Sequence, residues 1–231
     1  MVAGAVGSLG PDDLSEIGVR AVAVDVLELA MGAGLQRVAN LGGIGSYLGW
    51  DGRILAVARW STAPPLSPGW RGRALPRLER KRESRLLLRS AVDGALTEVD
   101  LEELARVVAG LGAQPSADLV PGGSPVVWWN DADGGAPPGP CVVTALAQEE
   151  AARGRYRAGR GWRDLVVVRD SPDDGHRPLV EGCACRACSR ASLALLRHLW
   201  RSREITAAHM LCWHNLHSLF LEVEPRNGPR G

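Results

Sequence analysis

The chain has 231 residues, of which 45% are hydrophobic and 23% are charged, and its formal net charge is +1 at pH 7. We expect from this composition a soluble protein that buries a real core, built as one domain with an appendage. A run of about 18 apolar residues is lacking, so we expect no membrane span. The first ten residues have no basic region of the secretory type, so we expect no export signal.

The first predicted elements are a helix followed by a strand. Pro11 at an early helical position, acids in the first turn and Gly18 after the last apolar residue predict a short helix. The run Val19 to Val24 is rich in Val and Ala and predicts a buried strand, and a second helix follows through about Val38. This order is the one expected of the first unit of a (β/α)8 barrel.

A glycine-rich run from Leu41 to Leu55 comes next. We interpret its glycines as tight backbone turns, Tyr47 and Trp50 as packing aromatics, and Asp51-Gly52 as a turn before a strand that begins at Ile54. A glycine-rich loop alone is weak evidence for any function.

The middle of the chain is basic and then turn-rich. Residues 71–89 hold eight basic side chains and two acids, and they predict a helix through Leu86–Leu88; this segment is either a solvated face or a surface that contacts phosphates. Thr97 and Asp100 resemble a capping box for a helix from Val99 to Leu111. Beyond these, we predict short strands at Val126–Trp129 and Leu165–Val168, the second after an arginine-rich stretch.

Three cysteines within six residues form the most informative motif. Cys183, Cys185 and Cys188 are too close together to pair efficiently as disulfides, whereas a C-x-C-x-x-C turn supplies three thiolates to one zinc ion. Two helices are predicted after them, and the second, from about Glu204 to Leu221, would return His214 as the fourth ligand. Thiolate ligands also fit a reducing cytoplasm, where we expect the protein to be found.

The other cysteine and histidines near this motif are expected to have ordinary roles. Cys212 is two residues from His214, and positions i and i+2 of a helix face apart, so we expect Cys212 in the core. For His198, His209 and His217 we favour packing or polar surface roles over metal ligation.

The cysteine motif and the residues after it resemble the C-terminal zinc signature of the tRNA-guanine transglycosylases. The matching residues are Cys183, Cys185, Cys188, His198-Leu199, Glu204-Ile205, Leu211 and His214-Asn215-Leu216. The run Leu41–Leu55 also resembles the family's stretch that leads into its active-site strand. The resemblance implies a (β/α)8 barrel with a zinc subdomain that serves structure and subunit contact, and an enzyme that exchanges a guanine of tRNA for a 7-deazaguanine base such as queuine or its precursor.

The sequence departs from the family at the positions that carry chemistry. Val57 stands where the family has its general acid/base Asp, and Pro140 stands at the nucleophile. Neither side chain can transfer a proton or attack a ribose. Asp25 and Glu28 stand where the family has an Asn and a His. Two nearby acids, Asp131 and Asp133, have the setting of turn residues.

A complete barrel takes about 250 residues, more than this chain leaves before its zinc motif. We therefore predict an α/β fold with a reduced TIM-like barrel in residues 1–170 and a zinc-binding helical subdomain in residues 171–231. We favour a non-catalytic family member that pairs with itself or with an active transglycosylase, or that holds tRNA. An active base-exchange enzyme with other carboxylates, and an enzyme or binder of 7-deazaguanine bases or nucleosides, remain the alternatives.

Overall fold

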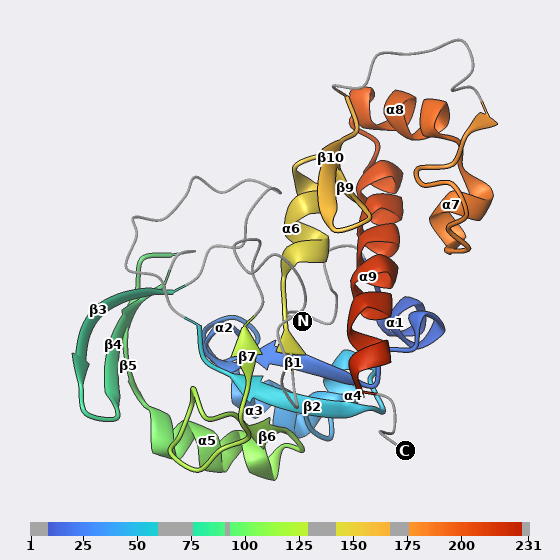
Figure 1. Ribbon diagram of the computed structural model, residues 1–231. Helices are drawn as coiled ribbons and strands as arrows, with labels where there is room; N and C mark the ends of the chain where they lie inside the picture. The colour runs from blue at the N-terminus through green and yellow to red at the C-terminus, as the bar shows by residue number, and fades with distance from the viewer. Residues whose placement is uncertain (1–8, 60–75, 91–92, 129–141, 167–175, 228–231) are drawn as a thin grey trace. The chain divides into compact units, whose positions relative to one another are not determined.

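The computed structural model describes residues 9–59, 76–90, 93–128, 142–166 and 176–227 (Figure 1). The chain divides into two compact units, one of residues 1–5 with 19–126 and the other of residues 6–18 with 127–231. Their extents differ from those of the predicted domains 1–170 and 171–231, which remain a prediction.

A parallel sheet is the centre of the first unit (Figure 1). Its strands lie in the order β1 (Ala21–Asp25), β2 (Arg53–Val57) and β6 (Gln114–Pro115), and β1 pairs with β2 in register from Ala21 with Arg53 to Asp25 with Val57. Four of the five residues of β2 are buried, as expected of a strand that is covered on both faces. The structure confirms the predicted strands near residues 19–24 and 54.

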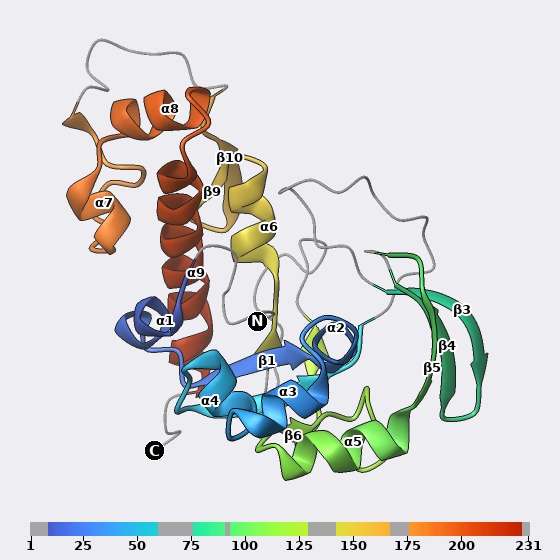
Figure 2. The same cartoon turned by 180° about the vertical axis from the view of Figure 1, so that it is seen from behind.

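Helices α2 (Val26–Met31), α3 (Leu35–Asn40) and α4 (Ile44–Leu48) connect β1 to β2 (Figure 2). The glycine-rich run thus contains a short helix that the sequence did not predict. Gly43 is required at the start of α4, because its φ is 102° and a Cβ there would lie 2.8 Å from the carbonyl oxygen of Leu111. The same carbonyl accepts a hydrogen bond from the Ile44 N–H at 2.9 Å.

A separate antiparallel sheet in this unit consists of β3 (Arg77–Arg82), β4 (Arg85–Arg89) and β5 (Leu96–Asp100). The predicted helix through Leu86–Leu88 is therefore wrong. Leu86 and Leu88 alternate with Leu87 and are both fully buried, so the run obeys the two-residue period of a strand. A short apolar run alone does not distinguish the two structures.

Helix α5 (Leu101–Gly110) follows β5 directly, and its cap differs from the predicted one. Asp100 is the N-cap, and its side chain accepts hydrogen bonds from the backbone N–H groups of Glu102 and Glu103 at 2.9 and 3.1 Å. Thr97 lies in β5, so the proposed Thr97-Asp100 capping box is wrong although the helix itself is confirmed.

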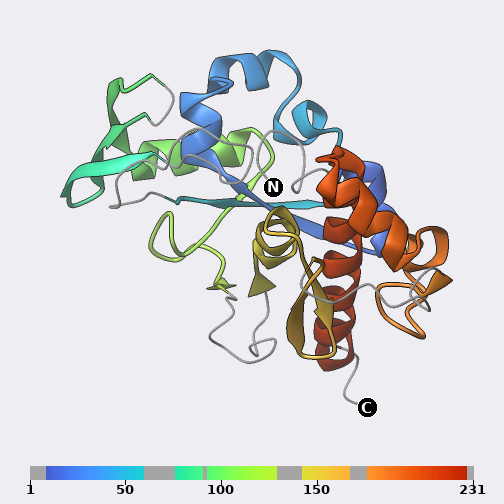
Figure 3. The same cartoon turned by 90° about the horizontal axis from the view of Figure 1, so that it is seen from above.

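Helix α9 (Ile205–Asn227) is the central element of the second unit (Figure 3). Its neighbours are helices α1 (Pro11–Ile17), α6 (Leu146–Ala152), α7 (Arg186–Arg190) and α8 (Leu193–Arg201) and the hairpin strand β9 (Arg155–Ala158). The remaining elements are the hairpin strand β10 (Gly161–Asp164) and the parallel pair β7 (Val127–Trp128) and β8 (Val142–Val143). The two helices predicted after the cysteines, α8 and α9, are confirmed.

The arginine-rich stretch before residue 165 forms the β9–β10 hairpin, which the sequence did not predict. Leu165 and Val166 lie in a turn after β10, so the predicted strand at Leu165–Val168 is wrong for these two residues; its other two residues lie outside the described part. The predicted strand at Val126–Trp129 is present as Val127–Trp128, and Trp129 lies outside the described part.

The described elements establish a mixed α/β protein, as the sequence predicted. A closed barrel is not among the sheets of the described residues, whose largest members have three strands. Among the same residues, no helix is long and apolar enough to cross a membrane.

Candidate metal centre

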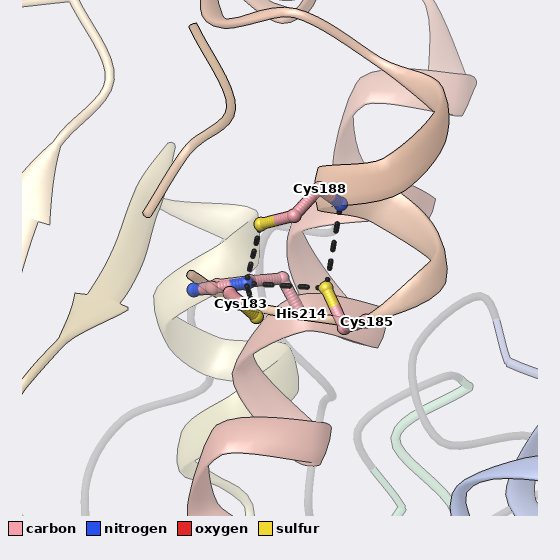
Figure 4. A group of neighbouring side chains, drawn as sticks. All are labelled: Cys183, Cys185, Cys188 and His214. Carbon is pink, nitrogen blue, oxygen red and sulfur yellow. Dashed lines mark hydrogen bonds between the residues drawn. The ribbon is translucent and has the colours of Figure 1, made fainter. Parts of the chain in front are cut away.

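The three cysteines and His214 come together around the start of α7 (Figure 4). Cys185 is the N-cap of α7, and its sulfur accepts a hydrogen bond from the Cys188 N–H at 3.4 Å. This bond curls the chain so that a single turn presents all three sulfurs. His214 projects from α9, which packs against α7. The structure therefore places His214 beside the three cysteines, as the sequence predicted.

The spacing of the four donor atoms fits a tetrahedral metal site. The Nδ1 atom of His214 lies 3.7, 3.4 and 3.3 Å from the sulfurs of Cys183, Cys185 and Cys188, and all four donors lie within 4.8 Å of one another. Around a tetrahedral zinc ion, with bonds of about 2.3 Å to sulfur and 2.0 Å to nitrogen, a sulfur and a nitrogen ligand lie about 3.5 Å apart. These residues can therefore hold a metal ion.

The imidazole is oriented by its other nitrogen. Nε2 of His214 lies 2.8 Å from the carbonyl oxygen of Arg157, which can only accept a hydrogen bond, so Nε2 carries the proton. The lone pair of the neutral ring is then on Nδ1, which faces the three sulfurs. A ligand histidine is held in this way by a backbone carbonyl in many metal proteins.

Asn215 holds the strand that supplies this carbonyl. Its Oδ1 accepts a hydrogen bond from the Arg157 N–H at 2.9 Å, and its Nδ2 donates to the carbonyl oxygens of Ala147 and Arg155 at 3.2 and 3.0 Å. Asn215 is fully buried. One side chain of α9 thereby fixes α6 and β9 beside the cluster, a role the sequence analysis missed. The sequence signal for this role was the amide side chain directly after His214 in the predicted helix.

The electrostatics of the four groups favour a bound cation. The interaction between the Cys185 and Cys188 side chains lowers the pKa of Cys185 to about 3 despite burial, whereas the same side-chain interaction, followed by burial, raises the pKa of Cys188. Burial lowers the pKa of His214, but the hydrogen bonds with Cys183, Cys185 and the Arg157 carbonyl outweigh it and raise this pKa to about 9. Three thiolates ionise together only when a dication compensates their mutual repulsion.

The cluster is protected from water and tied to a further helix. Cys185 and His214 are 2% and 1% exposed. Arg186, the residue between the ligand cysteines, reaches Asp13 and Glu16 of α1, in each case at 3.3 Å. The knuckle is thus linked to a segment more than 160 positions earlier in the sequence.

The residues expected to be ordinary neighbours are outside the cluster. Within the described part of the chain, Cys183, Cys185, Cys188 and His214 are the only group of this kind. Cys212 is buried in α9, as predicted. His217 stacks on Trp213 with ring centroids 6.0 Å apart, and His198 and His209 take no part in the cluster.

The positions that the resemblance ties to catalysis are Val57 and Pro140, and the nearby acids are Asp25, Asp131 and Asp133. Val57 is 2% exposed at the end of β2, and its partner across the β1–β2 ladder is Asp25. The Oδ1 atom of Asp25 caps α2 by accepting hydrogen bonds from Leu27 and Glu28 N–H groups at 3.0 and 3.2 Å. Pro140, Asp131 and Asp133 lie outside the described residues.

Comparisons with known proteins find relatives for the segment that contains the four donor residues. The family model of the queuine tRNA-ribosyltransferases matches residues 143–225, which include all four donors. The enzymes of this name from Cereibacter sphaeroides and Dinoroseobacter shibae are 44% and 50% identical to the chain over 64 and 72 residues. These stretches cover 26% and 31% of the chain but 17% and 19% of the relatives. The queuine tRNA-ribosyltransferase of Caldanaerobacter subterraneus is 41% identical over 63 residues, 27% of the chain and 17% of the relative.

Fold and site together define a mixed α/β protein with a Cys3His cluster that can hold a metal ion in its C-terminal unit. The matches point to one family. Residues 143–225 are similar to the queuine tRNA-ribosyltransferases, and the chain spans less than a fifth of the length of these curated relatives. The resemblance of Leu41–Leu55 to the family lies outside the matched residues and remains a prediction.

Proposed function

We propose that this protein is a shortened tRNA-guanine transglycosylase-like protein that acts in 7-deazaguanine (queuosine-type) modification of tRNA, as a non-catalytic partner or tRNA-binding subunit. The observation that carries the proposal is the donor cluster of Cys183, Cys185, Cys188 and His214 within the matched segment. The name of the relatives, queuine tRNA-ribosyltransferase, supplies the setting. We place the protein in the cytoplasm.

The metal in this proposal is zinc in a structural role. Three thiolates and one imidazole are a donor set that zinc prefers. Four protein ligands would also close its coordination sphere, so that no position is left for a substrate or a reactive water. The metal would stabilise the packing of α7 against α9 and would leave the chemistry to other residues.

The parallel sheet is proposed to be part of a reduced (β/α)8-type barrel. The supporting features are the parallel order β1-β2-β6 and the helices that precede β2 and β6 along the chain. A strand followed by a helix and a parallel neighbouring strand is the repeating unit of such barrels. The predicted size, below that of a full barrel, is part of the same proposal.

The non-catalytic role rests on Val57. Its side chain is buried at the carboxyl end of β2, where the parallel-sheet enzymes place catalytic groups, and an alkyl group cannot exchange a proton. A protein of this kind would contribute to the reaction through a second subunit, either another copy of itself or an active transglycosylase that it positions on tRNA.

The test is a base-exchange assay with labelled guanine and tRNA, run with the purified protein alone, with an active transglycosylase alone and with both. The proposal predicts no exchange by the protein alone and an exchange rate of the active enzyme that rises when both are present. Exchange by the protein alone contradicts the non-catalytic role. An unchanged rate in the mixture, together with no binding of tRNA, contradicts the partner role.

One observation favours a second candidate, an active base-exchange enzyme with displaced carboxylates. Asp25 is the in-register neighbour of Val57. Its carboxylate therefore lies one strand from the position at which the resembled family has its general acid/base Asp. It is 3% exposed, and its Oδ2 atom has no hydrogen-bond partner among the described residues. Burial raises its pKa above the ordinary value, against the lowering by the backbone N–H groups of Glu28 and Leu27.

Asp25→Asn tests this candidate, since an amide can still cap α2 through its oxygen but cannot transfer a proton. If the wild-type protein alone exchanges guanine and Asp25→Asn does not, the second candidate replaces the first. If neither protein exchanges guanine, the carboxylate of Asp25 serves as a helix cap.

A further inference from the structure

The β3–β4 hairpin has its arginines on one face. Leu78 pairs with Leu88 and Lys81 with Leu86, and this face buries Leu86 and Leu88 completely. Because directly paired residues of antiparallel strands point to the same side, the register gives the composition of the other face. The charged residues of the two strands on this outward face are Arg77, Arg80, Arg82, Arg85 and Arg89, joined by Glu79 at the bulge.

Acidic partners compensate the arginines of β4. Arg85 lies 3.7 Å from Glu98 and 3.8 Å from Asp100, both on β5. Arg89 pairs with Glu79 at 2.9 Å.

The arginines of β3 differ. In the described part of the chain, Arg77, Arg80 and Arg82 make no ion pair; Arg80 and Arg82 are exposed and Arg77 is half-buried. A row of uncompensated guanidinium groups therefore follows β3, which is the edge strand of the sheet (Figure 1).

We propose that the outward face of β3 and β4, on which Arg77, Arg80 and Arg82 are uncompensated, binds the phosphate backbone of RNA. A guanidinium group presents paired N–H donors that match two phosphate oxygens. Every second residue of a strand lies on one face at intervals of about 6.6 Å, so Arg80 and Arg82 can contact successive positions of a backbone. The edge of β3 adds unpaired backbone N–H groups beside them. The choice of RNA as partner rests on the proposed function.

Protection of the sheet edge against aggregation is the competing explanation. A charged edge strand discourages pairing with another chain, and for that purpose Lys81 on the inward face serves as well as Arg80 or Arg82. Phosphate binding requires the outward face. The two explanations therefore predict different results when charge is removed from the two faces of the same strand.

The experiment compares the double variant Arg80→Gln/Arg82→Gln with Lys81→Glu in the full-length protein. Both variants lower the formal charge by the same amount, on adjacent positions of β3 and on opposite faces. The measurement is the dissociation constant for an unmodified tRNA transcript between 50 and 300 mM salt, with thermal melting as the check of folding. For the double variant we expect about tenfold weaker binding, and a slope of log Kd against log salt that falls by about 1.5, since each lost contact removes about 0.7 to 0.9.

Lys81→Glu is expected to bind within about twofold of the wild-type protein with the same salt slope. Equal losses in both variants, or no loss in the double variant, would overturn the proposal. So would a wild-type protein that binds anionic phospholipid vesicles but not tRNA. A wild-type protein that binds tRNA through this face but has no effect on base exchange would support the proposal and contradict the proposed function, so the two can fail separately.

Discussion

In the C-terminal unit, three sulfurs and an imidazole nitrogen lie within 4.8 Å of one another, and a buried asparagine fixes the strand that orients the imidazole. In the parallel sheet of the other unit, the end of β2 carries a buried valine beside a buried aspartate. The first region has every group that a structural metal site needs. The second has at Val57 an alkyl side chain, which cannot transfer a proton.

The comparison teaches that the two roles depend on the sequence in different ways. A metal site with four protein ligands stabilises the fold whether or not the protein catalyses a reaction, so it can persist in a partner protein. A catalytic carboxylate costs free energy to bury, and a protein without that reaction gains stability from a branched alkyl side chain in its place.

The largest effect is expected from Cys183→Ser. It removes one ligand, so metal content should fall from about one ion per chain to near zero, and with it about 4 kcal/mol of stability, or about 8 to 16 °C in Tm. Metal analysis and calorimetry measure both quantities. Cys212→Ser is the matched control, because Cys212 is a buried cysteine of α9 outside the cluster; it should keep the metal. Equal metal content in the two variants would contradict the assignment.

Val57→Asp tests the other side of the comparison. A carboxylate at this buried position faces the carboxylate of Asp25 across the strand pair, and we expect a loss of about 3 kcal/mol or more in the free energy of unfolding. Adding Asp25→Asn removes the like charge and should restore at least about 1 kcal/mol. Chemical denaturation measures these values. A Val57→Asp variant as stable as the wild type would show that the position tolerates a catalytic carboxylate.

Asn215→Ala separates the support of the cluster from its ligands. The change removes three hydrogen bonds and leaves buried backbone groups of Arg157, Ala147 and Arg155 without this partner, so about 2 kcal/mol of stability should be lost. The metal should stay bound, because all four donors remain. Ser218→Ala is the control, because Ser218 is a half-buried residue of the same helix; it should change Tm by less than about 2 °C. Loss of metal from Asn215→Ala at full occupancy of the control would mean that the amide is needed for binding itself.

The last prediction concerns the pH dependence of metal binding. The pKa of His214 in the metal-free protein is raised to about 9, so the ring is an imidazolium at pH 7 and must lose a proton before Nδ1 can bind a metal. Cys188, with its raised pKa, must lose another. Metal affinity should therefore rise with pH between 7 and 9, by about tenfold or more per pH unit. Competition with a chelator at several pH values measures this slope, and a flat profile contradicts the ligand set.

The cluster of four donor side chains was predictable because its information is local. Cys183, Cys185 and Cys188 lie within one turn, and the only long-range step, the return of His214, needed two helices with clear apolar periodicity. The support by Asn215 was not predictable in the same way. Its three partners lie 58 to 68 positions earlier in the chain, on α6 and β9. An amide beside His214 indicates a buried polar role but does not identify these partners.

The fold was predictable where one element contained its own pattern. The helix Pro11–Ile17 has a proline at its start, acids in its first turn and Gly18 after its end. The strand Arg53–Val57 is a continuous apolar run after its first residue, and its last four residues are buried. The run Leu86–Leu88 was misassigned because its strand structure depends on partners in β3 and β5, which local periodicity does not show. The same holds for the arginine-rich hairpin of β9 and β10, whose buried side depends on α9.

X-ray absorption at the metal edge of the purified protein tests the central claim most directly. The account predicts zinc with three sulfur ligands at about 2.3 Å and one nitrogen ligand at about 2.0 Å. A metal surrounded by oxygen and nitrogen alone, or a protein purified without metal that binds none when zinc is added, would contradict it.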